Sequence, residues 1–107
     1  MPNSGKSYDL LDASGLRLQV KARTVGAGVH GSAKFSAFRS FDFDAALFVA
    51  FDLGTYDVVW ARMVGRAEVE AAVSYSAHIN ASSLRIRTAA LMGRDVTNEV
   101  SQAARVG

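Results

Sequence analysis

The chain has 107 residues, no cysteine, and 12 Lys and Arg against 10 Asp and Glu, which gives a formal charge of +2. This length indicates one small domain, and the absence of cysteine excludes disulfides and thiolate metal sites. Half of the residues are apolar and one is proline, which is typical of a packed globular domain. The longest apolar run, 45–51, is far shorter than the ~20 residues of a membrane-spanning helix. Residues 1–7 lack the pattern of a signal peptide, so we expect a cytoplasmic protein without a membrane partner.

The segment 7–23 alternates between apolar and polar residues and predicts two strands joined near Ser14 and Gly15. A loop of two residues would mix polar and apolar side chains on each face of this hairpin. A loop of three residues, with Gly15 in the left-handed conformation, pairs Asp12 with Leu16 and keeps the two faces separate. We therefore expect the longer loop, with the apolar face on the core and the polar face toward solvent.

Strand patterns dominate the first part of the chain and helix patterns come late, which predicts a mostly antiparallel meander followed by helices. The expected elements are a glycine-containing loop at 25–32, a short edge strand at 34–39, a central strand at 45–52, a turn at 53–55, a strand at 57–64, a helix at 66–78, a strand at 84–88, and a last helix that begins at Asp95 or Thr97.

Asp9, Gln19 and Lys21 form the strongest candidate site. In the chosen register Asp9 lies opposite Gln19, about 5 Å away at Cβ, and Lys21 lies about 7 Å farther along the same face. A carboxylate and an amide oxygen so placed can bind a hard divalent cation, and a neighbouring ammonium can orient water or stabilise phosphate charge. The alternative interpretation is a solvent-exposed face without catalysis, because such a face of any antiparallel hairpin carries residues of these types.

The stretch 8–23, YDLLDASGLRLQVKAR, resembles the Tyr-Asp … Gly … Gln-(Ile/Val)-Lys-x-Arg signature of small bacterial members of the PD-(D/E)XK nuclease superfamily. The similarity continues, more weakly toward the end, through Phe41, Asp42, Phe43, Asp44, Tyr75, His78, Asn80 and 95–97. The resemblance implies an α/β (α+β) fold of the restriction endonuclease-like type, with a mixed sheet, over the single domain 1–107. It implies that Asp9 and Gln19 bind Mg²⁺ or Mn²⁺ and that Lys21 is the catalytic lysine of DNA phosphodiester hydrolysis.

The sequence departs from the family pattern at its start. Family members usually open with a helix that packs on the sheet and supplies a Glu, whereas only residues 1–6 precede the first predicted strand. The chain is then truncated, covered by another subunit, or inactive. Because an uncovered apolar sheet face is unusual for a monomer, we expect a homodimer. The alternative functions are a nonenzymatic nucleic-acid-binding or assembly module and a structural domain without a ligand.

Four basic residues are candidates for contacts with DNA. Arg17 and Arg23 flank Lys21 on the same strand face, and Lys34 and Arg39 lie among phenylalanines, a mixture typical of single-strand binders. The basic residues equally fit a solvated surface, and the phenylalanines fit the packed aromatic residues of a sheet.

Other polar residues give weaker signals. Asp42 and Asp44 precede the predicted central strand, where turn-forming Asp is common, and a direct metal role is the alternative. His30 and His78 are too far apart in sequence to form a recognisable zinc pattern.

Overall fold

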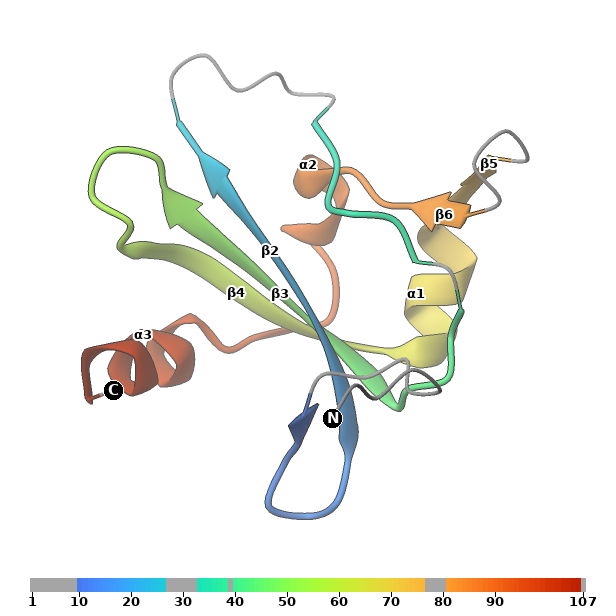
Figure 1. The fold of residues 1–107 in the computed structure, drawn as a ribbon, viewed down its shortest axis with the longest axis horizontal. Coiled ribbons are helices and arrows are strands. Elements are labelled where there is room, and N and C mark those ends of the chain that lie inside the picture. The colour runs from blue at the N-terminus through green and yellow to red at the C-terminus, as the bar shows by residue number, and fades with distance from the viewer. Residues whose placement is uncertain (1–9, 27–32, 39, 77–80, 107) are drawn as a thin grey trace, which may run out of the picture.

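The chain folds around a five-stranded mixed sheet with the order β1-β2-β3-β4-β7, and a separate two-stranded sheet joins β5 to β6 (Figure 1). The computed structural model describes residues 10–26, 33–38, 40–76 and 81–106. The elements are β1 (Leu10–Leu11), β2 (Arg17–Val25), β3 (Ala45–Asp52), β4 (Val58–Gly65), α1 (Arg66–Ala72), β5 (Ser74–Ser76), β6 (Ala81–Ser83), α2 (Ile86–Ala89), β7 (Arg94–Asp95) and α3 (Thr97–Val106). The predicted α+β class with a mixed sheet is therefore confirmed.

The opening hairpin has the predicted three-residue loop. Leu10 pairs with Leu18 and Leu11 with Arg17, which is the register that places Asp12 opposite Leu16. Gly15 has a φ of 87°, in the left-handed region. The Asp12 carboxylate accepts hydrogen bonds from the Ser14 and Leu16 N–H groups at 2.8 and 2.9 Å, so a side chain satisfies the backbone of the turn.

Strands β2 and β3 run parallel, so the predicted antiparallel meander is wrong at this pair. Parallel neighbours cannot be joined by a tight turn, so the chain leaves β2 and crosses one face of the sheet before it enters β3. The nearly continuous apolar sequence of β3 fits its position between β2 and β4. β3 lies where it was predicted, and β4 begins and ends one residue later than predicted.

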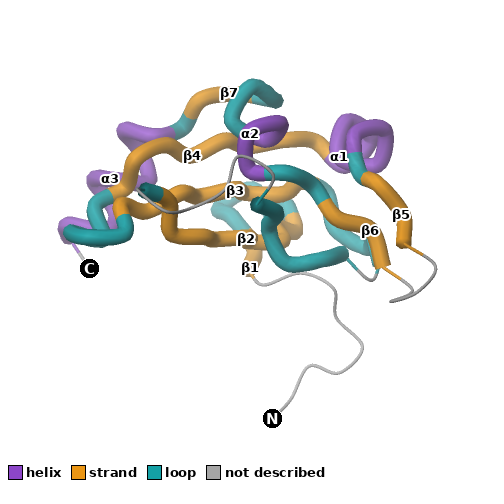
Figure 2. Tube along the Cα trace, turned by 90° about the horizontal axis from the view of Figure 1, so that it is seen from above, coloured by secondary structure: helices purple, strands orange, loops and turns teal. Residues whose placement is uncertain are grey.

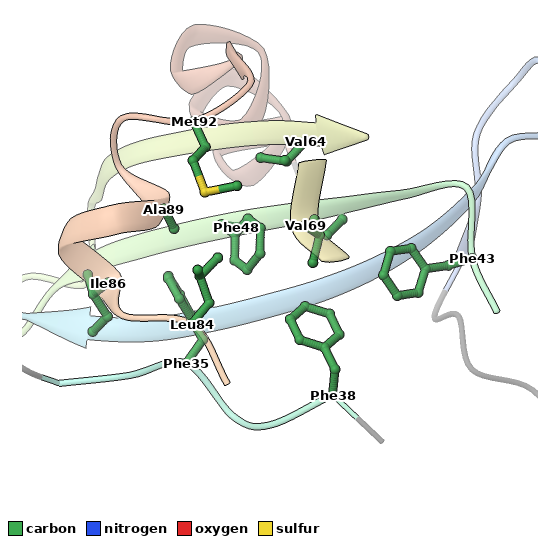
Figure 3. Packing of buried hydrophobic residues seen from close by; sticks show 11 residues of the cluster. Phe35, Phe38, Phe43, Phe48, Val64, Val69, Leu84, Ile86, Ala89 and Met92 are labelled. Carbon is green, nitrogen blue, oxygen red and sulfur yellow. The ribbon is translucent and has the colours of Figure 1, made fainter. Parts of the chain in front are cut away.

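Each face of the sheet carries a hydrophobic cluster. The larger one lies between the sheet and the segments 33–38, α1 and α2, and its labelled members are Phe35, Phe38, Phe43, Phe48, Val64, Val69, Leu84, Ile86, Ala89 and Met92 (Figure 3). The smaller cluster joins Val49 and Ala61 to Val96, with Val100 of α3 packed against it. Figure 2 shows α3 at the end of the sheet away from α1.

The larger cluster covers the polar face of β2 at Lys21, so the prediction that this face meets solvent is wrong there, whereas Arg23 on the same face is exposed. Gln19, Lys21 and Arg23 pair in register with Ala46, Phe48 and Ala50 of β3. The side chain of Lys21 is buried, with a relative exposure of 8 %, whereas its neighbour Ala22 is exposed. The crossover is the physical reason, because residues 33–38 bring Phe35 and Phe38 onto this face.

Three predicted elements differ from those observed. Within the described part of 34–39 there is no strand, since the chain crosses over the sheet and makes only isolated bridges from Lys34 to Arg85 and from Phe38 to Ser82. The helix predicted at 66–78 ends at Ala72, where Val73 becomes extended and leads into β5, while His78 lies outside the described residues. The strand predicted at 84–88 is wrong, because 86–89 form α2 and bury Ile86 and Ala89 one turn apart.

The last helix, α3, begins at Thr97, one of the two predicted starts. Asp95 Oδ1 accepts hydrogen bonds from the Thr97 hydroxyl at 2.5 Å and from the Thr97 N–H at 2.9 Å, and these two bonds lower the pKa of Asp95. The Thr97 hydroxyl oxygen in turn accepts a hydrogen bond from the Ala61 N–H at 2.9 Å, so the start of α3 is tied to β4. Among the described residues, no helix has the length and apolar character needed to cross a membrane.

Gly93 is expected to tolerate no side chain. Its φ is 61°, and an added Cβ would lie 2.2 Å from the Met63 carbonyl oxygen and 2.8 Å from Val64 Cγ2. We expect Gly93→Ala to lower the free energy of unfolding by about 3 kcal/mol or more, measured by urea denaturation, because backbone strain and overpacking combine. Gly15→Ala is the control, since its φ is 87° but no heavy atom lies within 4 Å, and it should lose only about 1 kcal/mol. Equal losses for the two variants would contradict the close packing of Gly93 against β4.

Candidate functional site

The structure places two of the three predicted catalytic residues on one face of β2. Gln19 and Lys21 are two residues apart on a regular strand, and their partners Ala46 and Phe48 both belong to the larger cluster. Asp9 lies outside the described residues. The expected register is present at the neighbouring pairs, Leu10 with Leu18 and Leu11 with Arg17.

Lys21 is held beneath the crossover segment 33–38. Its ammonium donates hydrogen bonds to the Ala37 carbonyl oxygen at 3.0 Å and to the Ser36 hydroxyl at 3.2 Å. Its Nζ also lies 4.6 Å from the centroid of the Phe38 ring, in a cation–π contact. Removing a charge from water is unfavourable unless it gains hydrogen bonds, so these contacts compensate for the burial of Lys21. They also fix the position of the ammonium.

Arg17 is engaged by two acidic residues. Its guanidinium contacts Asp42 Oδ1 at 3.0 Å and Asp44 Oδ2 at 3.2 Å, and its backbone N–H donates to Asp44 Oδ2 at 2.8 Å. The Arg17 side chain is the main cause that lowers the pKa of Asp44, followed by the Arg17 N–H. Asp42 and Asp44 therefore join the start of β2 to the start of β3, and this pairing compensates the charge of Arg17.

Arg23 and Lys34 lie together at the other end of the crossover. The Arg23 guanidinium donates a hydrogen bond through Nη1 to the Lys34 carbonyl oxygen. Both residues are exposed, which is compatible with the predicted contact to DNA. Arg39 lies outside the described residues.

The described residues do not by themselves complete a cation site. They contain no group of three or more His, Asp or Glu side chains able to hold a metal ion. The Gln19 side chain has one neutral amide oxygen, and Asp42 and Asp44 are bound to Arg17. A site for Mg²⁺ or Mn²⁺ next to Lys21 would therefore require the carboxylate of Asp9.

The sequence patterns miss the residues that hold Lys21. Ser36 and Ala37 are small residues in a segment predicted as an edge strand. Ala37 binds Lys21 through its backbone carbonyl, a group that every residue has, so the sequence does not indicate this contact. Arg85 is also missed, although the structure places it directly opposite Lys34. No protein-family model matches this chain, and a search of curated proteins finds no similar sequence.

The contacts of Lys21 predict a stabilising role for its ammonium. Lys21→Met keeps most of the apolar stem and removes the donors to Ser36 and Ala37, so the free energy of unfolding should fall by about 2 kcal/mol. Hydrogen exchange should quicken at the Phe35 and Phe38 amides, which donate to Leu84 and Ser82 across the crossover.

Lys34→Met is the matched control for Lys21→Met. Lys34 is an exposed lysine on the crossover itself, so its replacement should change the free energy of unfolding by less than about 0.5 kcal/mol. If both variants unfold at the same urea concentration as the wild type, the ammonium of Lys21 does not hold the crossover.

The pairing of Asp44 with Arg17 predicts a pH dependence. Because the pKa of Asp44 is lowered from its ordinary value of 3.8, the contribution of its carboxylate is present above that pH and is lost as the pH falls through the lowered pKa. Asp44→Asn should therefore be less stable than the wild type near neutral pH. The difference in melting temperature should shrink as the pH falls below 3.8. A difference that stays constant into acid would contradict the ion pair.

Proposed function

We propose that the chain is a metal-dependent nuclease of the PD-(D/E)XK type, with a restriction endonuclease-like fold, that hydrolyses DNA phosphodiester bonds. The observation that carries the proposal is the common face of Gln19 and Lys21 on β2, in a hairpin whose register at Leu10 and Leu11 matches the one expected from the alternation of polar and apolar residues. The mixed sheet is compatible with this fold class.

The residues divide into roles by their chemistry. Asp9 and Gln19 would hold Mg²⁺ or Mn²⁺, which polarises the phosphate and lowers the pKa of a bound water when it is present. The ammonium of Lys21 would orient a water molecule or stabilise the negative charge that develops on the phosphate oxygens. Its bonds to Ser36 and Ala37 support this role, because a fixed donor needs no rearrangement at the moment of reaction.

A second candidate function is a nonenzymatic nucleic-acid-binding module with the same fold. The burial of Lys21 under 33–38 favours it, because a lysine that ties the crossover to β2 has a structural role without any catalysis. In that case the exposed residues Arg23 and Lys34 contact the DNA backbone, and Gln19 has no metal to bind.

Cleavage of plasmid DNA separates the two functions. With Mg²⁺ or Mn²⁺ and excess protein, we expect the wild type to cleave, and Lys21→Met and Asp9→Asn to lower the single-turnover rate constant by about 100-fold or more. Gln19→Glu should keep the activity, since it restores a carboxylate where related signatures carry one, whereas Gln19→Ala should lose it.

The controls for this assay are folding and DNA binding. Thermal melts must show that each variant is folded at the assay temperature, and anisotropy must show that it still binds DNA. A wild type that binds DNA but cleaves with neither cation supports the nonenzymatic module. Cleavage that survives both Lys21→Met and Asp9→Asn would contradict the proposed catalytic residues.

A further inference from the structure

A polar cavity lies where Lys34 of the crossover meets the end of α1, the segment 83–85 and α2. Its volume is about 280 Å³, and the described residues that line it are Lys34, Ala72, Ser83, Leu84, Arg85 and Thr88. Two of these are cationic, two carry hydroxyls, and none of them is acidic. Since a water molecule occupies about 30 Å³ in the liquid, the cavity has room for a small polyatomic anion together with solvent.

The backbone forces the two cations of this cavity together. Phe35 N–H donates to the Leu84 carbonyl at 3.0 Å, and Ile86 N–H donates to the Ala33 carbonyl at 2.9 Å. These bonds flank the antiparallel bridge between Lys34 and Arg85, which makes these two residues a non-hydrogen-bonded pair. In such pairs the side chains are closer than at any other position of an antiparallel ladder.

Like charges directly opposite one another repel, so an anion bound between them would be favourable. Among the described residues, neither Lys34 nor Arg85 forms a salt bridge with a carboxylate. A third cation, Arg23, donates to the Lys34 carbonyl from β2 and adds positive charge beside the pair. Phe35 and Leu84, each 2 % exposed, anchor both segments in the core, so the two cations cannot simply move apart at the backbone.

We propose that this cavity binds a phosphate group through Lys34 and Arg85, with the hydroxyls of Ser83 and Thr88 as additional donors. A tetrahedral anion with several acceptor oxygens satisfies both cations at once, and a guanidinium suits it particularly well. The phosphate group comes either from a nucleic-acid backbone or from a free phosphate or nucleotide. The inference rests on the proposed function only for the first source, because binding at this cavity requires neither Lys21 nor a divalent cation.

The test measures binding in EDTA, so that no cleavage occurs. Anisotropy of a fluorescein-labelled single-stranded oligonucleotide is titrated at several KCl concentrations with the wild type, Lys34→Gln, Arg85→Gln and the double variant that carries both substitutions. Calorimetry at constant ionic strength measures inorganic phosphate and adenosine monophosphate with the same proteins. Arg87→Gln is the matched control, because it removes one positive charge from an exposed residue of α2 that does not line the cavity.

If the source is nucleic acid, Lys34→Gln and Arg85→Gln should each weaken oligonucleotide binding by about tenfold and reduce the slope of log K against log salt by about 0.7. Arg87→Gln should change the affinity by less than about twofold. If the source is a free phosphate or nucleotide, calorimetry should detect it with the wild type and not with the double variant.

The proposal is overturned if Arg87→Gln weakens binding as much as the two cavity variants do, since the effect is then one of overall charge. It is also overturned if the oligonucleotide, inorganic phosphate and adenosine monophosphate each bind the wild type and the double variant with the same affinity, or bind neither. If the protein binds phosphate at this cavity but does not cleave plasmid DNA, only the nuclease proposal is contradicted. The two proposals can therefore be tested independently.

Discussion

The parallel pairing of β2 with β3 is the constraint on which the rest of the structure depends. It obliges the chain to return across one face of the sheet, and that face carries the polar side chains of β2. A polar face is a poor surface for a phenylalanine-rich segment unless its charges find partners. The hydrogen bonds from Lys21 to Ser36 and Ala37, and its contact with the Phe38 ring, make this packing possible.

The same crossover places the cations of the molecule in distinct environments. Lys21 is buried beneath it, and Lys34 is exposed on it, opposite Arg85 at the rim of a polar cavity. Arg17, at the start of β2, is compensated by Asp42 and Asp44. These four basic residues thus differ in their surroundings: Lys21 is buried in the core, Arg17 joins two strands, and Lys34 and Arg85 form the pair that we propose binds a phosphate group. A net charge of +2 gives no hint of this division.

Local patterns predict the elements whose pairing is local. The hairpin loop follows from Gly15 and the alternation around it, and β3 follows from its apolar run. Sequence patterns do not predict the features that depend on contacts between segments far apart in the sequence. The direction of β2 relative to β3, the burial of Lys21 and the pairing of Lys34 with Arg85 all depend on how residues 33–38 cross the sheet, and no periodicity encodes that path. In the candidate site, the common face of Gln19 and Lys21 is predictable from period two, whereas the groups that hold Lys21 are not.

The most direct test of this account is the NMR signal of the Lys21 side chain in the intact protein. With Nζ 4.6 Å from the centroid of the Phe38 ring, the Lys21 Hε protons should be shifted upfield of those of exposed Lys34 by the ring current. Phe38→Leu should remove that shift. The account would be contradicted if the Hε signals of Lys21 and Lys34 had the same random-coil position in the folded wild type, because the Lys21 ammonium would then not be buried against Phe38.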